Sequence, residues 1–155
     1  MLKTTCSFFG HRNTEETIEL KTRLEKVIED LILNENVDTF LFGSKSRFDD
    51  ICYDVVTVLK EKHSHVKRIY VRAEYPIITD DYKNFLLKSY EDTIFPEKLV
   101  DAGKAVYVER NFEMIRKSDF CVFCYKEENV LKNRKSGTKI ALDYAVKQGK
   151  RIKYV

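Results

Sequence analysis

The amino-acid sequence predicts an α/β fold, and three observations carry that prediction. Short apolar runs at 5–9, 39–42, 66–71, 120–125 and 152–155 alternate with amphipathic stretches, which is the pattern of strands joined by crossover helices. The run at 120–125 is apolar throughout, as expected of a central strand buried on both faces. The 155 residues contain no internal repeat, low-complexity tract or sign of a second domain. We therefore expect residues 1–155 to form a single Rossmann-like three-layer domain, with a mainly parallel sheet of about five strands flanked by helices.

Helices are predicted where apolar residues recur at helical spacing. The first stripe consists of Leu20, Leu24, Val27, Ile28 and Leu31. Its expected N-cap is Asn13 or Thr14. Further helices are expected around 49–59, at 112–117 and from Gly137, with Gly149 at the C′ position of the last one. The stretch 74–104 is less regular and is expected to hold a helix flanked by loops that covers one side of the sheet, and 105–108 is a candidate for a short extra strand.

Charge and hydropathy exclude several classes of protein. The 28 basic and 25 acidic residues give a net charge of +3 and are spread along the chain, which argues against a nucleic-acid-binding arm. There is no run of 18 apolar residues and no secretion signal, so we expect a cytoplasmic protein that does not enter the membrane.

The four cysteines are expected to be buried thiols in a reducing compartment. Cys121 and Cys124 are three residues apart in a predicted strand, so their side chains point to opposite faces, which disfavours a disulfide or shared metal. His63 and His65 have no evident third ligand, and no metal site is expected.

Small and polar residues follow two predicted strands and precede the last predicted helix. They are the segments Gly10-His11-Arg12, Gly43-Ser44-Lys45-Ser46 and Ser136-Gly137-Thr138. In an open parallel sheet a ligand usually lies beyond the carboxyl ends of the strands, where helix N-termini offer unpaired N–H groups to anions. The alternative is that the glycines serve only tight turns; three such segments together favour a binding site.

Single side chains allow more than one role. His11 is suited to donate to a phosphate or act as an acid or base, or to hydrogen-bond the turn backbone. Arg12 and Arg110 offer the bidentate donors that phosphate prefers. Asp49 is either a helix cap or a contact for a ribose hydroxyl. The tyrosines of the irregular stretch are suited to stack on a base or to pack over the sheet, and packing is favoured.

Four short motifs, in order over nearly the whole chain, resemble the YpsA-like branch of the SLOG superfamily. They are residues 6–12 (CSFFGHR), residues 43–49 ending in Phe48-Asp49, residues 110–115 (RNFEMI) running into Ser118-Asp119, and the start Ser136-Gly137-Thr138 followed by Ala145 and Gly149-Lys150. The resemblance implies a Rossmann-like fold related to the Lonely Guy phosphoribohydrolases and to DprA-type DNA-processing proteins, with a pocket for nucleotides or nucleotide-derived signals.

The same resemblance implies which residues line that pocket. They are Gly10, His11, Arg12, Gly43, Ser44, Asp49, Arg110, Asn111, Ser136, Gly137 and Thr138. The family's usual paired glycines are replaced by Gly43-Ser44 and Ser136-Gly137. The Lonely Guy enzymes carry a catalytic glutamate where this chain has Ala141, so Asp49 and Glu109 are left as candidate catalytic acids for a glycosidic bond.

We therefore expect a sensor or regulatory module that binds a ligand such as ADP-ribose, NAD or an AMP-like nucleotide. No cofactor is expected to be required. Homo-oligomerisation is compatible with the sequence. The alternatives are a nucleotide N-glycosidase and a DNA-associated protein of the DprA type. The dispersed charge argues against the second alternative, because a site that follows a nucleic-acid backbone needs clustered Lys and Arg.

Overall fold

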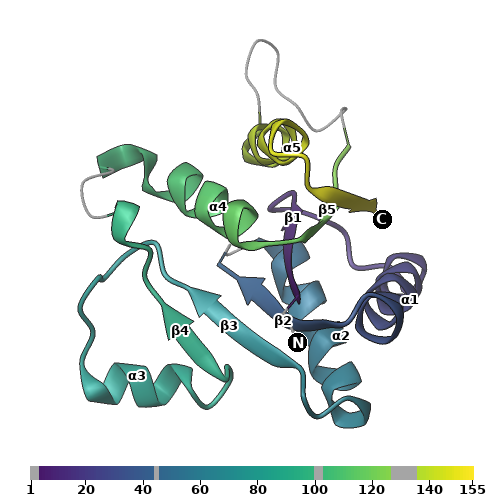
Figure 1. Cartoon of the computed structure of the whole chain (residues 1–155), viewed down its shortest axis with the longest axis horizontal. Helices are drawn as coiled ribbons and strands as arrows, with labels where there is room; N and C mark the ends of the chain where they lie inside the picture. Colours follow the sequence, from purple (N-terminus) through teal and green to yellow (C-terminus); the bar gives the residue numbers. More distant parts are fainter. Residues whose placement is uncertain (1–3, 44–45, 100–102, 127–135) are drawn as a thin grey trace.

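A computed structural model describes residues 4–43, 46–99, 103–126 and 136–155, and its centre is a parallel β-sheet (Figure 1). The six strands are β1 Thr4–Gly10, β2 Val37–Phe42, β3 Lys67–Val71, β4 Asp92–Ile94, β5 Phe120–Cys124 and β6 Arg151–Tyr154. Every pairing between neighbouring strands is parallel, and the order across the sheet is β4-β3-β2-β1-β5-β6. The predicted α/β class is confirmed.

The order of the strands creates a topological switch point beside β1. The first four strands are added outward from β1 in one direction, and the chain then returns to place β5 on the other side of β1. Connections that leave in opposite directions from neighbouring strands open a crevice outside their carboxyl ends. In this molecule the crevice lies beyond the ends of β1 and β5.

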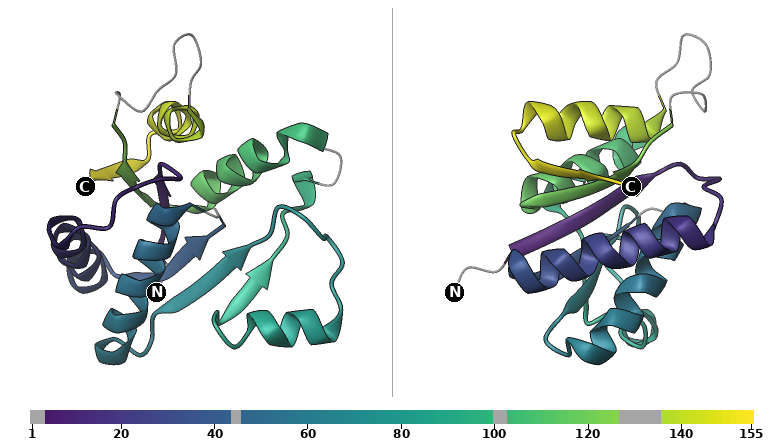
Figure 2. Two further views of the ribbon diagram at one scale, coloured as in Figure 1. Left: turned by 180° about the vertical axis from the view of Figure 1, so that it is seen from behind. Right: turned by 90° about the vertical axis from the view of Figure 1, so that its right-hand side faces the viewer.

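Helices cover both faces of the sheet, as Figure 2 shows. The helices α1 Ile18–Asn34 and α2 Arg47–Lys62 pack on one face, and α4 Val106–Lys117 and α5 Gly137–Lys147 pack on the other. Each face has its own apolar core, so the central strands are buried on both sides. Among the described ranges, no helix has the length and apolar content that a bilayer crossing requires.

The central strand β5 confirms the expectation for its cysteines. Cys124 belongs to the core beneath α1 and α2, whereas Cys121 belongs to the core beneath α4 and α5. Both thiols are free and buried, and their opposite orientations follow from the two-residue repeat of a strand.

Two predicted helix starts were wrong. The helix α1 begins at Ile18 with Thr17 as its N-cap, since Thr14 is used to close a turn on the His11 carbonyl oxygen. The residues 105–108 do not form a strand: they complete a 3-10 turn, Gly103–Ala105, and begin α4, six residues before the helix predicted at 112. Their β-branched and aromatic side chains favour a strand locally, but packing of α4 through Met114 and Ile115 overrides that preference.

The irregular stretch holds a strand that the sequence did not reveal, which raises the count from about five strands to six. The chain leaves β3, forms the short helix α3 Asp80–Leu86 and returns as β4, followed by a 3-10 turn, Glu97–Leu99. The helix α3 lies beside the edge strand β4 and buries only Leu86, so it does not cover a face of the sheet as predicted (Figure 1).

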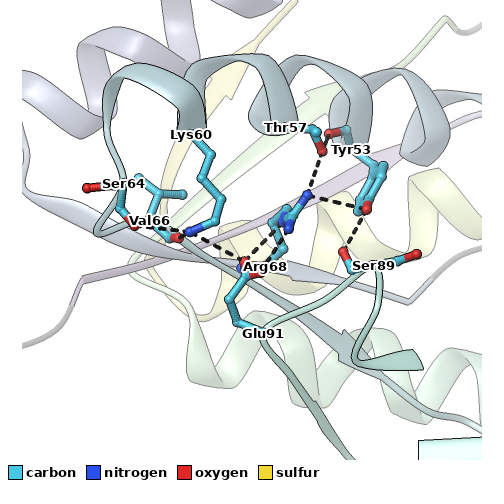
Figure 3. Close-up of polar contacts among 8 residues, drawn as sticks. All are labelled: Tyr53, Thr57, Lys60, Ser64, Val66, Arg68, Ser89 and Glu91. Carbon is cyan, nitrogen blue, oxygen red and sulfur yellow. Dashed lines mark hydrogen bonds and ion pairs between the residues drawn. The ribbon is translucent and has the colours of Figure 1, made fainter. Parts of the chain in front are cut away.

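A polar network anchors the segment between α3 and β4 to the rest of the domain (Figure 3). The guanidinium of Arg68 in β3 holds the carboxylate of Glu91 through two bonds, Nε to Oε1 at 3.0 Å and Nη2 to Oε2 at 2.8 Å. Its third nitrogen donates to Thr57 of α2 at 3.0 Å, and the Tyr53 hydroxyl of the same helix donates to the Ser89 carbonyl at 2.6 Å. The network fixes the segment that links α3 to β4 against β3 and α2.

Candidate ligand-binding site

A cavity of about 720 Å³ opens at the carboxyl ends of β1 and β3 and at the start of α5. Eight of the residues predicted to bind a ligand line it: Gly10, His11, Arg12, Arg110, Asn111, Ser136, Gly137 and Thr138. They come from three segments separated by up to 128 residues of chain, from position 10 to position 138. The fold therefore brings together most of the residues that the sequence singled out, in a cavity of the size typical of small-molecule sites.

One end of the cavity combines the turn after β1 with the start of α5. The Ser136 hydroxyl caps α5 by accepting from the Lys139 N–H at 3.1 Å. The N–H groups of the first two helical residues, Gly137 and Thr138, have no acceptor within the helix and lie where the helix dipole is positive. Arg12 lies on the β1 side of this end and adds a full positive charge. Such an arrangement favours an anionic group.

His11 serves the turn backbone and still lines the cavity. Its Nε2 accepts a hydrogen bond from the Lys126 N–H at 3.0 Å, so the neutral ring carries its proton on Nδ1. The ring also lies against Tyr125, with centroids 5.4 Å apart. Burial is the main cause that lowers the pKa of His11. The contact with Lys126 joins the end of β1 to the end of β5, which is the structural role considered for this residue, while Nδ1–H remains as a donor.

Arg110 enters the cavity from α4 and is 5% exposed. Its Nη1 donates to the Gly43 carbonyl at 2.5 Å, and its buried Nε has no hydrogen-bond partner within the described residues. Burial lowers the pKa of Arg110, and the nearby charge of Asp49 opposes that shift. A guanidinium is charged in proteins at all ordinary pH values, so this is a buried cation beside the cavity.

Gly43 and Asp49 lie behind the cavity and do not line it. Asp49 is 4% exposed and its Oδ2 accepts from the Gly43 N–H at 3.2 Å, while its own N–H donates to the cap residue Ser46 at 3.1 Å. A methyl group on Gly43 would lie 3.0 Å from Arg110 and from the Met114 sulfur. Both residues therefore shape the end of β2 and the start of α2, but the N-cap of α2 is Ser46, so the prediction that Asp49 caps the helix was wrong.

Two further candidates fall elsewhere. Glu109 is half-buried in α4 and is not among the described residues that line the cavity. Ser44 lies outside the described residues. Neither of the two candidate catalytic acids, Asp49 and Glu109, is therefore part of the cavity wall in the described chain.

The opposite wall of the cavity was missed by sequence reasoning. It is formed by Tyr70 at the end of β3, by Arg72, Glu74 and Tyr75 just after it, by Tyr82 of α3 and by Tyr107 of α4. The rule that ligands lie at strand ends applies to β3 as well as to β1. The end of β3 was overlooked because it carries no glycine, and because the tyrosines of this stretch were expected to pack over the sheet.

The charges of the cavity favour an anion. Among the described residues, its lining includes three arginines, Arg12, Arg72 and Arg110, and one carboxylate, that of Glu74. The Glu74 carboxylate accepts a hydrogen bond from the Tyr107 hydroxyl. No group of three or more His, Cys, Asp or Glu side chains in the described ranges is placed to hold a metal ion.

Fold and cavity together define a Rossmann-like α/β domain with a positively charged cavity at its switch point. The chain is 30% identical over 148 residues to the uncharacterized SPbeta prophage-derived protein YoqJ of Bacillus subtilis, and the match covers 84% of this chain and 82% of that protein. The chain belongs to the family of this prophage-derived protein. No family model matches the sequence.

Proposed function

We propose that this protein binds a nucleotide or a nucleotide-derived ligand in the cavity and acts as a sensor or regulatory module. The observation that carries the proposal is the convergence of the Gly10-His11-Arg12 turn, the α5 N-terminus and the buried Arg110 on one cavity. Backbone N–H groups and guanidinium donors in that combination suit phosphate oxygens. The same residues underlie the proposed place in the YpsA-like branch of the SLOG superfamily. Four buried, free thiols accord with a cytoplasmic site of action.

Binding without turnover is favoured because, in the described part of the chain, neither of the two candidate catalytic acids lines the cavity. Asp49 accepts from the Gly43 amide behind the cavity, and Glu109 is absent from the described wall. The carboxylate that does reach the described wall, that of Glu74, accepts from Tyr107. The N-glycosidase alternative predicts release of free base from the bound nucleotide.

Titration calorimetry with ADP-ribose, NAD and AMP tests the proposal directly. We expect at least one of them to bind, and the variant Arg12→Ala to weaken binding by roughly 10-fold or more, as expected for loss of a hydrogen bond to a charged group. The control is Arg151→Ala, since Arg151 is an exposed arginine of β6 outside the cavity.

Two outcomes would contradict the proposal. The first is no heat of binding for any of the three compounds at millimolar concentration. The second is equal weakening by Arg12→Ala and Arg151→Ala, which would show that the cavity does not bind the ligand. Chromatography of the same mixtures after incubation separates a binding protein from a hydrolase, because only a hydrolase releases adenine or nicotinamide.

A further inference from the structure

The wall of the cavity facing the β1 turn is aromatic. The rings of Tyr70, Tyr75, Tyr82 and Tyr107 line it, and they come from β3, the loop after it, α3 and α4. Tyr75 is 61% exposed and Tyr107 is 48% exposed, so these two rings are only partly covered by protein. Tyr75 and Tyr82 lie edge to face, with centroids 6.4 Å apart. A wall of this kind offers ring faces and edges to a planar molecule.

The backbone that presents Tyr75 is held in an unusual conformation. Tyr75 has φ of 61°, in the left-handed region that bulky side chains rarely adopt. Its carbonyl accepts from Arg72 Nε at 3.2 Å, and the Nη1 of the same guanidinium donates to the Thr93 hydroxyl of β4 at 2.9 Å. Backbone strain supported by surrounding bonds is found most often at functional sites. The loop is therefore braced in the shape that points Tyr75 toward the cavity.

Arg72 also brings a donor to this wall. The residue is 8% exposed and lines the cavity. Two of its guanidinium nitrogens brace the loop, and in the described chain its Nη2 makes no hydrogen bond. A buried guanidinium with an unused amino group is a donor for an acceptor atom on the edge of a ligand.

The strand order indicates how far the aromatic wall lies from the β1 turn and the α5 N-terminus. In the order β3-β2-β1-β5, the end of β3 is two strands from β1 and three strands from β5. With strands about 4.8 Å apart, the two ends lie roughly 10 to 14 Å from each other. A free phosphate or a free base would occupy one end only, whereas a nucleotide has its phosphate and its base at opposite ends of a ribose.

We infer that the wall formed by Tyr70, Tyr75, Tyr82 and Tyr107 is a subsite for the aromatic base of a nucleotide whose phosphate lies at the β1 turn and the α5 N-terminus. Arg72 donates to an acceptor on the edge of that base. This inference rests on the proposed function and adds the orientation of the ligand and the residues that select a base.

The test compares AMP with ribose 5-phosphate, which lacks the base, by titration calorimetry. The wild-type protein should bind AMP roughly 5- to 150-fold more tightly, which is the usual contribution of stacking a base on aromatic side chains. The double variant Tyr75→Ala/Tyr82→Ala should weaken binding of AMP, ADP-ribose or NAD by a similar factor and change the affinity for ribose 5-phosphate by less than about twofold. Tyr154→Ala is the matched control, since Tyr154 is 63% exposed in β6 and is not part of the cavity lining.

The outcomes separate this inference from the proposed function. If a nucleotide binds the wild type and the double variant equally well, or if ribose 5-phosphate binds as tightly as AMP, the base subsite is wrong while nucleotide binding stands. If none of the nucleotides binds the wild type at millimolar concentration, the proposed function fails and the subsite falls with it. The comparison of AMP with ribose 5-phosphate needs no variant, so a folding defect in the double variant would not prevent a decision.

Discussion

Gly10 and Gly137 belong to two of the predicted binding segments, but they have different physical roles in this protein. A Cβ atom added to Gly10 would lie 2.3 Å from the ring of Phe48, a fully buried residue of α2. Gly10 is thus required by the close packing of α2 on the end of β1. A Cβ atom on Gly137 meets nothing within 4 Å, although Gly137 lines the cavity. The space next to Gly137 is therefore open, whereas the space next to Gly10 is filled by Phe48.

These contacts predict that the same substitution, glycine to alanine, has different effects on stability at the two positions. Gly10→Ala should lower the free energy of unfolding by about 1–3 kcal/mol, because the Phe48 ring must shift in a well-packed core. Gly137→Ala should change it by less than about 0.5 kcal/mol and should weaken binding of any phosphate compound that approaches the α5 N-terminus. Urea unfolding of both variants, with calorimetry of Gly137→Ala, checks the pair. A destabilisation of similar size in both would contradict the assignment of the contacts.

At the scale of elements, the position of the segment that holds α3 and β4 depends on a few polar contacts. The strand β4 has three residues and, in the described sheet, lies at the edge, where it pairs with β3. The network of Figure 3 holds the residues just before β4: Glu91 pairs with Arg68, and its Oε1 lies 3.9 Å from Lys60 Nζ. Burial raises the pKa of the Glu91 carboxyl, but the hydrogen bonds and charge of Arg68, with the charge of Lys60, together outweigh it and lower the pKa. The Arg68 side chain is only 12% exposed, so solvent screens this pair less than a surface pair.

Glu91→Gln should therefore destabilise the segment that holds α3 and β4 without unfolding the domain. We expect a loss of about 1–2 kcal/mol, since the substitution removes a bidentate bond between charged groups. Hydrogen exchange should report the change at the amide of Arg72, which donates to the Ile94 carbonyl at 2.8 Å. The control is Glu35→Gln, which breaks an exposed pair with Arg151 and should cost less than about 1 kcal/mol. Unchanged exchange at Arg72 in Glu91→Gln would show that the network does not hold β4.

At the scale of the whole molecule, strong periodic patterns were predictable and context-dependent features were not. The strand β5 and the apolar stripe of α1 were predicted because burial on one or both faces leaves a direct pattern in the sequence. The strand β4 leaves none: it has three residues, and its place depends on pairing with β3. The start of α4 was missed because Val106 to Val108 favour a strand in isolation. Of the eight predicted residues that line the cavity, three lie where a strand ends in glycine and three begin a helix, and both signals are visible locally; Arg110 and Asn111 came from the resemblance to the YpsA-like branch. The tyrosine wall depends instead on where α3 and α4 lie in space.

From the pKa shifts of its buried groups, we expect the stability of the domain to be highest near neutral pH. Burial raises the pKa of the thiols of Cys6, Cys52 and Cys124, and raises that of Cys121 to about 11, so folding is disfavoured as pH rises above 9.0. In acid the sign is reversed. The pKa of His11 is lowered from 6.5 in the folded state, so the unfolded chain binds more protons and stability is lost as pH falls below that value.

The acid side of this profile is where the contact between β1 and β5 can be tested. A protonated His11 cannot accept from the Lys126 N–H, so acidification removes the 3.0 Å bond that joins the two strand ends. We expect the wild type to lose stability between about pH 7.5 and 5.5, and His11→Gln to lose less over the same interval because glutamine does not titrate there. Urea unfolding at both pH values measures the difference, with His65→Gln as the control, since His65 is exposed and lies outside the cavity. Equal losses in the wild type and His11→Gln would mean that His11 takes no part in the acid sensitivity. A loss in His65→Gln equal to that of the wild type would exclude His65 as a source of the acid sensitivity.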